Sequence, residues 1–417
     1  MKFNPWQLCL ALVALSVLLS TAVWAQYSEL TAHNFGAVAN DALNPTTGLV
    51  EDSAGNLYGT AAQGGLGFGA AYELSPAHGG GYNETLIYLF AGGTDAAQPS
   101  GSLIIDASGN LYGVSQAGGA NNRGTVYELS PSTGGWTEKI LYSFQGNSDG
   151  QSPTGSVTFD KNGNLYGTTL QGGGSSNCFQ GCGTVFIMTP TSTGWVEKPI
   201  VGFSGGSDGG APSGNLLIDI NLNVYGTTLE GGVVNSNCPV GCGLVFRLVP
   251  QLTYWRMSRL FTFQGGGSGS GPSGLAFDAL GNLYGDTSLG GPICTVDVGC
   301  GVVYQLTPAV GQWKQRILHA FTGRLDGAQP AGVAFDSLGN LFGTTNYGNV
   351  GNNGIVWELT PTTSGPWTLT RIYSFGHGFS GARPDAGVIV DANGNLFGTT
   401  SAGGASGRGT AFTLTPP

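Results

Sequence analysis

The chain has 417 residues, of which 75 are glycine and only 9% are charged, and its formal net charge is −10. This acidic balance excludes binding to the nucleic-acid backbone, which needs a basic surface. Abundant glycine without a Gly-X-Y period can indicate disorder. However, 40% of the residues are hydrophobic and they recur at fixed offsets, so disorder is excluded as well.

The first 25 residues have the features of a secretory signal peptide. Lys2 precedes an apolar stretch over residues 8–23, and small residues around Ala25 suit cleavage. A membrane anchor is the alternative, but sixteen residues are short for a span of about 20. We therefore expect residues 1–25 to be removed. The mature chain is predicted to be secreted, extracellular or periplasmic, without a membrane span.

A repeated segment fills the rest of the chain. The motif Gly-Asn-Leu-Tyr-Gly, or a close variant, occurs seven times, and its Asn recurs at intervals of 54, 54, 59, 59, 58 and 55 residues. Such a period indicates one supersecondary unit used repeatedly. These asparagines are Asn56, Asn110, Asn164, Asn223, Asn282, Asn340 and Asn395.

Each unit predicts four β-strands. In the second unit, residues 102–106 and 110–115 flank a turn and form a hairpin, 124–130 alternates, and 136–144 is the fourth strand. Four antiparallel strands in a unit of roughly 40 to 60 residues are typical of a propeller blade. The sequence therefore predicts an all-β, seven-bladed β-propeller with four-stranded antiparallel blades.

The two ends of the chain are predicted to share the last blade. The seventh unit ends at Pro417 after its third strand, whereas residues 27–35 show the aromatic-to-Phe spacing of the other fourth strands. We expect 27–35 to be the outer strand of that blade, because closure removes exposed sheet edges. Residues 26–417 then form a single domain, with blades at about residues 46–90, 100–144, 154–203, 213–263, 273–321, 331–375 and 385–417.

Three features repeat in every unit and have structural explanations. An Asp lies four residues before each motif Asn, and we interpret it as a turn cap rather than a catalytic group. Aromatic residues mark the third strand and both ends of the fourth. Blade-to-blade packing explains them most simply, and a sugar-binding platform is the alternative. The aspartates are Asp52, Asp106, Asp160, Asp219, Asp278, Asp336 and Asp391.

Six of the seven cysteines form close sequence pairs, while Cys9 lies in the signal peptide. In an exported chain this pattern predicts disulfides, each contributing about 2 kcal/mol in the chain-entropy model; metal binding is the alternative. The paired cysteines lie in longer loops over 171–182, 230–242 and 290–300. We interpret these loops as a raised rim that forms a recognition surface. The alternative is that the cross-links only stabilise long loops. The pairs are Cys178 with Cys182, Cys238 with Cys242, and Cys294 with Cys300.

The connectors between units contain the other candidate binding residues. Five of them carry an Asp four residues before a Pro, and a ring of such carboxylates could hold Ca²⁺; otherwise no cofactor is expected. The alternative is five separate turns. His33 and His319 occupy a packing position, whereas His377 is on the loop face. The candidate binding residues are Asp41, Asp95, Asp149, Asp208, Asp326, Arg324, Arg383 and His377.

The pattern D-x-x-G-N-L-Y-G-T-T-x-x-G-G, followed by G-T-V-Y-x-L-(S/T)-P and L-Y-S-F-x-G-x-x-D-G-x-x-P, resembles the tandem repeat called GloVer, the Gloeobacter–Verrucomicrobia repeat. The third unit matches through Asp160, 163–168, 172–173, 183–186 and Pro190. The resemblance implies an exported bacterial surface protein and no particular activity. Kelch and NHL-type blades are more distantly similar, which supports the fold alone.

No catalytic constellation is visible, because the four histidines form no triad, metal site or acid–base pair. We therefore expect a non-catalytic, monomeric propeller that serves as a binding or surface-scaffold module. The sparse charge favours a polysaccharide or another envelope protein as its partner. The alternative is a polysaccharide lyase or glycoside hydrolase on the same scaffold.

Overall fold

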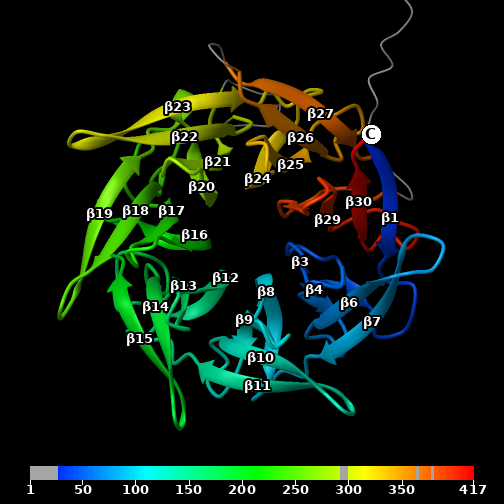
Figure 1. Cartoon of the computed structure of the whole chain (residues 1–417). Coiled ribbons are helices and arrows are strands. Elements are labelled where there is room, and N and C mark those ends of the chain that lie inside the picture. The colour runs from blue at the N-terminus through cyan, green and yellow to red at the C-terminus, as the bar shows by residue number, and fades with distance from the viewer. Residues whose placement is uncertain (1–26, 292–298, 363–365, 377–379) are drawn as a thin grey trace, which may run out of the picture.

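In the computed structural model, the chain forms a ring of seven four-stranded antiparallel sheets around a central axis (Figure 1). The structure describes residues 27–291, 299–362, 366–376 and 380–417. No helix within these residues is long and apolar enough to cross a membrane. The prediction of an all-β, seven-bladed propeller is confirmed.

The strands follow each other from the hub outward in six consecutive blades. The first three blades contain β3 (Val50–Glu51), β4 (Leu57–Ala61), β6 (Ala70–Pro76) and β7 (Tyr82–Leu89); β8 (Ala96–Ile105), β9 (Leu111–Gly118), β10 (Thr125–Ser132) and β11 (Gly135–Ser143); and β12 (Gln151–Phe159), β13 (Leu165–Gln171), β14 (Thr184–Thr191) and β15 (Gly194–Gly202). The next three contain β16 (Gly210–Ile218), β17 (Val224–Glu230), β18 (Leu244–Pro250) and β19 (Trp255–Thr262); β20 (Ser270–Phe277), β21 (Leu283–Leu289), β22 (Val302–Ala309) and β23 (Gln312–Ala320); and β24 (Ala328–Phe335), β25 (Leu341–Tyr347), β26 (Ile355–Thr360) and β27 (Thr368–Ser374). The short pair β2 (Ala42–Leu43) and β5 (Gln63–Gly64) and the 3₁₀ turn η1 (Gly266–Ser268) lie in connections.

The seventh blade is composite, as the sequence predicts. It consists of β28 (Ile389–Val390), β29 (Leu396–Thr400), β30 (Thr410–Thr415) and, as its outer strand, β1 (Ser28–Asn34). Ser28 pairs with Thr415 and Asn34 with Thr410, and the Phe35 N–H donates to the Gly409 carbonyl at 3.1 Å. The blue β1 and red β30 accordingly lie side by side in Figure 1.

The hairpin turn between the first two strands of each blade is held by its Asp. In the first blade, Asp52 Oδ1 accepts the N–H groups of Ala54 and Asn56 at 2.8 and 2.9 Å, and Oδ2 accepts the Asn56 side-chain amide at 2.9 Å. All seven turns repeat this arrangement. These carboxylates are therefore occupied by their own turns, as the capping interpretation predicts.

A glycine on the second strand of each blade makes room for the aromatic side chain of the third. Gly113 is opposite Tyr127 in the sheet, and a Cβ at Gly113 would lie 2.5 Å from the Tyr127 ring. The aromatic side chain at this position is fully buried in every blade. The motif glycine is thus required by close packing within one blade.

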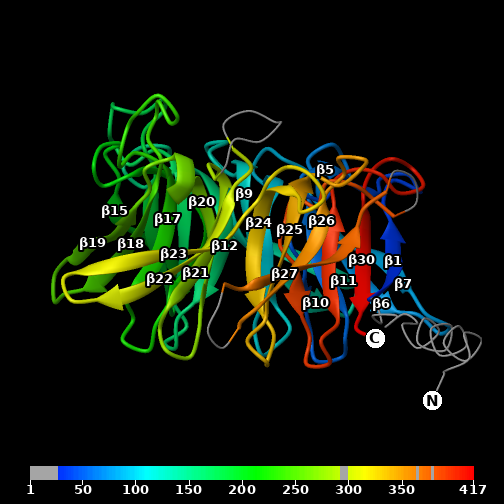
Figure 2. The same ribbon diagram turned by 90° about the horizontal axis from the view of Figure 1, so that it is seen from above.

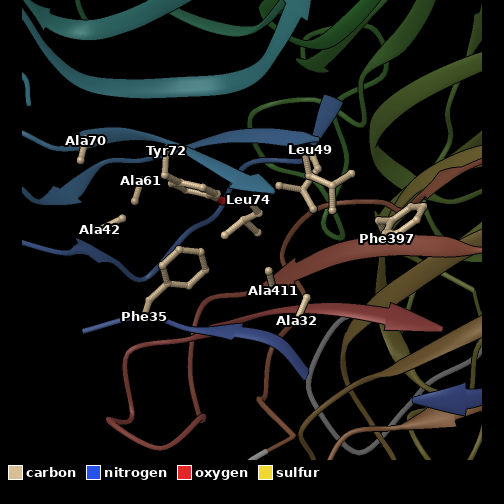
Figure 3. Packing of buried hydrophobic residues seen from close by; sticks show 11 residues of the cluster. Ala32, Phe35, Ala42, Leu49, Ala61, Ala70, Tyr72, Leu74, Phe397 and Ala411 are labelled. Atoms are coloured by element: carbon tan, nitrogen blue, oxygen red, sulfur yellow. The ribbon is translucent and has the colours of Figure 1, made fainter. Parts of the chain in front are cut away.

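The blades are joined by pairs of aromatic rings. The Phe that ends the outer strand of one blade contacts the third-strand aromatic of the next, with ring centroids 4.8–6.0 Å apart. Among the described residues, each interface has one hydrophobic cluster of this kind. Figure 3 shows the cluster at the ring closure, where Phe35 and Ala32 from one end of the chain meet Tyr72, Ala411 and Phe397. Packing, rather than sugar binding, explains these aromatic residues. The pairs are Phe35–Tyr72, Phe90–Tyr127, Phe144–Phe186, Phe203–Phe246, Phe263–Tyr304, Phe321–Trp357 and Phe375–Phe412.

Every outer strand contains a β-bulge two to three residues before its Phe. In β1 the register shifts between Thr31 and His33, so Ala32 has no partner in the ladder and its side chain is buried, with 5% exposed. A bulge re-aims the residue that follows it. Here this residue is His33.

Candidate functional site

The rim predicted from the cysteine-bearing loops is present where the structure describes it. Cys178 bonds to Cys182 and Cys238 to Cys242. Figure 2 shows green loops that rise above one edge of the ring near β15 and β17. Cys300 is disulfide-bonded, while Cys294 and most of the third loop lie outside the described residues.

The first disulfide packs against a connector glycine. A Cβ at Gly205 would lie 2.5 Å from Cys178 Sγ and 2.9 Å from Cys182 Sγ. Gly205 belongs to the connector that leads from the third blade to the fourth. The disulfide closes a short loop within the rim and packs closely against this connector.

A polar hollow of about 450 Å³ lies at the foot of the rim, between the second and third blades. Arg123 Nη1 donates to Gln151 Oε1 at 2.8 Å, and Gln151 Nε2 donates to Gln171 and Gln180, both at 3.1 Å. This chain of hydrogen bonds joins three residues that line the hollow, Arg123, Gln151 and Gln180. No carboxylate is among the described lining residues, which are Arg123, Gly146, Asn147, Ser148, Gln151, Gly172, Gly174, Ser175, Ser176, Gln180 and Gly181.

Apolar side chains are exposed on the same loops. Phe179 lies between the two cysteines of the first disulfide, adjacent in sequence to the pocket residue Gln180, and 84% of it is exposed. Val234 and Val240 on the next rim loop are 62% and 61% exposed. Phe179 is not itself a lining residue, but an exposed aromatic ring one residue along the chain from the hollow adds a stacking face to its hydrogen-bonding groups.

The hub has a different character. All seven blades contribute to a cavity of about 400 Å³ that is lined mainly by Gly, Ser, Thr and Asn residues. Neighbouring inner strands approach so closely that a Cβ at Gly101 would overlap the Gly155 carbonyl, and one at Gly155 would overlap that of Gly214. Asp385 is the one carboxylate among the described lining residues. Its burial raises the pKa of Asp385, although Ser401 and Arg383 oppose the rise.

Asp286 is a second hub carboxylate, which the sequence reasoning did not single out. It occupies a position where four other blades have a Thr that hydrogen-bonds an inner-strand carbonyl. Asp286 is fully buried, and Ser273 donates to its Oδ2 at 2.7 Å. Burial raises the pKa of Asp286 to about 7. The departure of Gly285-Asp286-Thr287 from Gly-Thr-Thr was the signal that could have identified it.

The five connector aspartates do not come together. Each accepts the backbone N–H four residues earlier, as Asp95 does from Ala91 at 2.7 Å. Ser268 and Ser380 accept the same hydrogen bond in the other two connectors. Within the described residues, the one group of three or more His, Cys or carboxylate side chains close enough to share an ion includes Asp41 alone of the five. The geometry fits separate turns rather than a Ca²⁺-binding ring.

The remaining candidate residues are scattered. Arg324 is exposed, and its carbonyl accepts the Asn349 N–H at 2.7 Å. Arg383 has a φ of 58° and its guanidinium lies 5.4 Å from the centroid of the Tyr347 ring. His377 lies outside the described residues.

His33 and His319 do more than pack. Each lies 4.8 Å from the ring of the nearby Phe, as the packing interpretation expects. However, each Nε2 also lies 3.2 Å from a carboxylate, that of Glu84 for His33 and that of Asp326 for His319. The interpretation as packing residues alone was therefore incomplete.

The fold and the repeated turns define a seven-bladed β-propeller built from tandem repeats. The profile of the Gloeobacter/Verrucomicrobia repeat matches residues 23–238 and 232–417. The chain therefore belongs to this repeat family, and the resemblance found in the sequence is confirmed. No curated protein sequence matches the chain significantly.

Solved structures with a similar fold have low sequence identity. The extracellular domain of a candidate hybrid two-component system from B. thetaiotaomicron is 12% identical with a TM-score of 0.55, covering 93% of this chain and 39% of that one. A candidate 6-phosphogluconolactonase from Bacteroides fragilis is 14% identical with a TM-score of 0.50, covering 91% and 88%. At these identities the likeness concerns the fold alone.

Proposed function

We propose that this protein is a secreted binding module that captures a polysaccharide at the rim, with the hollow around Arg123 and Gln180 as its binding site. The observation that carries the proposal is the combination of a pocket rich in hydrogen-bonding groups, with no carboxylate among its described lining residues, and the exposed Phe179 ring. Sugars present hydroxyl groups and apolar ring faces, and both kinds of partner are available here.

Charge supports a neutral, hydroxylated ligand over an envelope protein. Asn147, Ser148, Ser176 and Gln180 provide uncharged donors and acceptors at the pocket. Arg123 is the one cation among the described lining residues, and one of its N–H groups already donates to Gln151. A protein partner would need a larger apolar contact than Phe179 and the rim valines provide.

The disulfides support export. Disulfides persist in oxidising compartments such as the periplasm and the extracellular space. The Cys178–Cys182 and Cys238–Cys242 bonds lie on the proposed binding face, where they would hold the loops in a bound-like shape. A preorganised loop loses less entropy on binding a ligand.

A glycan array followed by titration calorimetry tests the proposal. We expect wild-type protein to bind a neutral glycan, and Phe179→Ala to weaken binding about 3- to 10-fold, because an aromatic contact contributes about 0.5–1.5 kcal/mol. Asn147→Ala should weaken it as well. Val240→Ala, which removes a similarly placed apolar group from the next rim loop, is the matched control. Equal effects of the Phe179 and Val240 substitutions would contradict the proposal, as would an array without any bound glycan.

A second candidate is a polysaccharide lyase or glycoside hydrolase that works at the hub. Asp385 favours it, because this carboxyl group lines the hub cavity and burial raises its pKa, and a raised pKa suits a general acid. A reducing-sugar assay with the array-positive glycans separates the two candidates. Turnover that is lost in Asp385→Asn would favour the enzyme, whereas binding without turnover favours the rim module.

A further inference from the structure

Three side chains meet where the ring closes. His33 comes from β1 of the last blade, Asp41 from the connector that follows it, and Glu84 from β7 of the first blade. We call His33, Asp41 and Glu84 the closure triad. One potential ligand atom of each side chain lies within 4.8 Å of the others, and His33 Nε2 is 3.2 Å from Glu84 Oε2.

The closure triad is buried and its hydrogen-bonding capacity is not fully used. Asp41 is 2% exposed and the Glu84 side chain 8% exposed. Apart from the contact between His33 and Glu84, the buried atoms Asp41 Oδ1, Glu84 Oε1 and His33 Nε2 have no hydrogen-bond partner among the described residues. Buried polar atoms without partners are costly, so an arrangement of this kind calls for a ligand.

The next two interfaces have the same geometry with Tyr in place of His. Tyr88 donates to Asp95 at 3.3 Å, and Tyr142 donates to Asp149 at 2.9 Å. Glu138 and Glu197 from the following blades take the place of Glu84, and their Oε1 atoms also have no hydrogen-bond partner among the described residues, so the unpartnered Asp41 Oδ1 and the imidazole are what distinguish the closure triad. A phenol is a hydrogen-bond donor at neutral pH, so it satisfies the connector carboxylate directly. An imidazole can instead offer a lone pair to a metal ion.

We propose that the closure triad binds a divalent transition-metal ion, with His33, Asp41 and Glu84 as ligands and Zn²⁺ as the best fit. One imidazole nitrogen and two carboxylate oxygens form a donor set that Zn²⁺ accepts, whereas Ca²⁺ prefers oxygen ligands alone. Three protein ligands leave one position of a tetrahedral ion for water. A separation near 3.2 Å between His33 Nε2 and Glu84 Oε2 is close to the edge of such a tetrahedron, about 3.4 Å for ligand distances of about 2.1 Å.

The position of the triad gives the ion a structural role. β1 is joined to the rest of the ring by its ladder with β30 and by side-chain packing. An ion shared by His33 and Glu84 would connect β1 directly to the outer strand of the first blade. Metal binding would thus stabilise ring closure, because a site that exists only in the folded state couples binding to folding.

The chain contains its own controls. His319 is also 3.2 Å from its connector residue Asp326, but Leu369 stands where the closure triad has Glu84, two residues after the aromatic that begins the strand. No residue in the described part of the chain therefore supplies a third ligand at this interface. His33→Tyr copies the residue of the next two interfaces, so it should remove metal binding while preserving the fold, and His319→Tyr should leave metal binding unchanged.

Native mass spectrometry and calorimetry on untagged, EDTA-treated protein test the proposal. We expect one equivalent of Zn²⁺ per chain, a Tm that rises with Zn²⁺ and falls with EDTA, and affinity at least about 100-fold weaker in His33→Tyr than in wild type. His319→Tyr should match wild type. Co²⁺ should bind at the same site, and the bound ion should absorb visible light as expected for a coordination geometry of low symmetry.

Three outcomes would overturn the proposal. These are no stoichiometric binding of Zn²⁺ or Co²⁺ by wild-type protein, unchanged affinity in a folded His33→Tyr protein, and preferential binding of Ca²⁺ at the triad. If His33→Tyr does not fold, Glu84→Gln provides the second variant, since it keeps the size of the side chain and removes a charged ligand. Retained Zn²⁺ affinity in Glu84→Gln would contradict the proposal equally.

Discussion

The interface between the last and first blades and the interface between the first and second differ by one side chain at a shared position. Both have a bulged outer strand, a connector Asp and a Glu on the following blade, and both pair a Phe with a buried Tyr. At the interface between the last and first blades, His33 faces two carboxylates. At the interface between the first and second blades, Tyr88 donates a hydrogen bond to the connector carboxylate of Asp95. In a repeat protein, comparison of equivalent positions therefore shows where one exceptional residue, here His33, changes what the shared carboxylates around it can bind.

The largest effect should come from removing the shared Phe at each interface. Phe35→Ala and Phe90→Ala should each lower the free energy of unfolding by about 3–5 kcal/mol, because both side chains are fully buried against a Tyr. The interfaces should differ in hydrogen exchange. Phe35→Ala should speed amide exchange selectively in β1, because no hairpin connects β1 to β30. Phe90→Ala should instead speed amide exchange in both the first and the second blade, which meet at this residue.

Denaturant unfolding and amide exchange of the two variants make this comparison. If the amides of β1 exchange no faster in Phe35→Ala than in Phe90→Ala, closure of the propeller does not depend on the contact between the Phe35 and Tyr72 side chains. A Phe→Leu change at each position keeps most of the apolar volume and serves as the milder control.

Tyr88→His sharpens the comparison by building the closure triad at a second interface. The introduced imidazole would face Asp95 and Glu138 as His33 faces Asp41 and Glu84, so the variant should bind a second equivalent of Zn²⁺. At about 100 times its Kd, the ion should add about 2.7 kcal/mol to the stability of the variant. Thermal unfolding with and without Zn²⁺, together with native mass spectrometry, measures this. A folded variant with no second ion would show that an imidazole at this position does not by itself create the site.

The smallest effect concerns two buried carboxyl groups at the Tyr interfaces whose pKa values are raised. Burial, with Asp95 nearby, raises the pKa of Glu138 to about 9, and burial, with Asp149 nearby, raises that of Glu197 to about 7. The folded protein then holds these protons to higher pH than the unfolded chain. Stability from this source is complete below about pH 4.5 and is lost as the pH rises toward about 9.

Glu138→Gln tests this dependence, because Gln mimics the protonated acid. At about pH 8 the variant should melt about 1–3 °C above wild type, and at about pH 5 the two should melt together. Calorimetry across this range is the measurement, and Glu128→Gln on β10 of the same blade controls for charge removal. A variant that is less stable than wild type at the higher pH would show that Glu138 is charged in the fold.

The sequence predicted the fold because every blade repeats its own local signals. The Asp–Asn turn, the glycine opposite an aromatic ring and the Phe at the end of the outer strand each appear seven times, so chance agreement is excluded. Even the closure was visible, since residues 27–35 contain the fourth strand that the last unit lacks. These features are local, or they involve neighbouring units in a fixed order.

The candidate sites were less predictable, because they depend on which residues meet across an interface. Glu84 lies 51 residues after His33 in the sequence, and only the bulge in β1 and the packing of two blades bring them together. The Ca²⁺ hypothesis considered Asp41 with its equivalents around the ring, whereas its neighbours in space are His33 and Glu84. The sequence shows Asp286 as a departure from the Gly-Thr-Thr motif, but it does not show that the side chain is fully buried.

The pairing of β1 with β30 also sets an order of events during synthesis. Among the described strands, the one that leaves the ribosome first is completed by the one that leaves it last, so β1 waits while six blades are assembled. Contacts between such distant segments form slowly. An unpaired strand edge invites association with other chains during this interval. The charged and polar residues Glu29, Thr31 and His33 lie along β1, and residues of this kind on an edge strand disfavour such association.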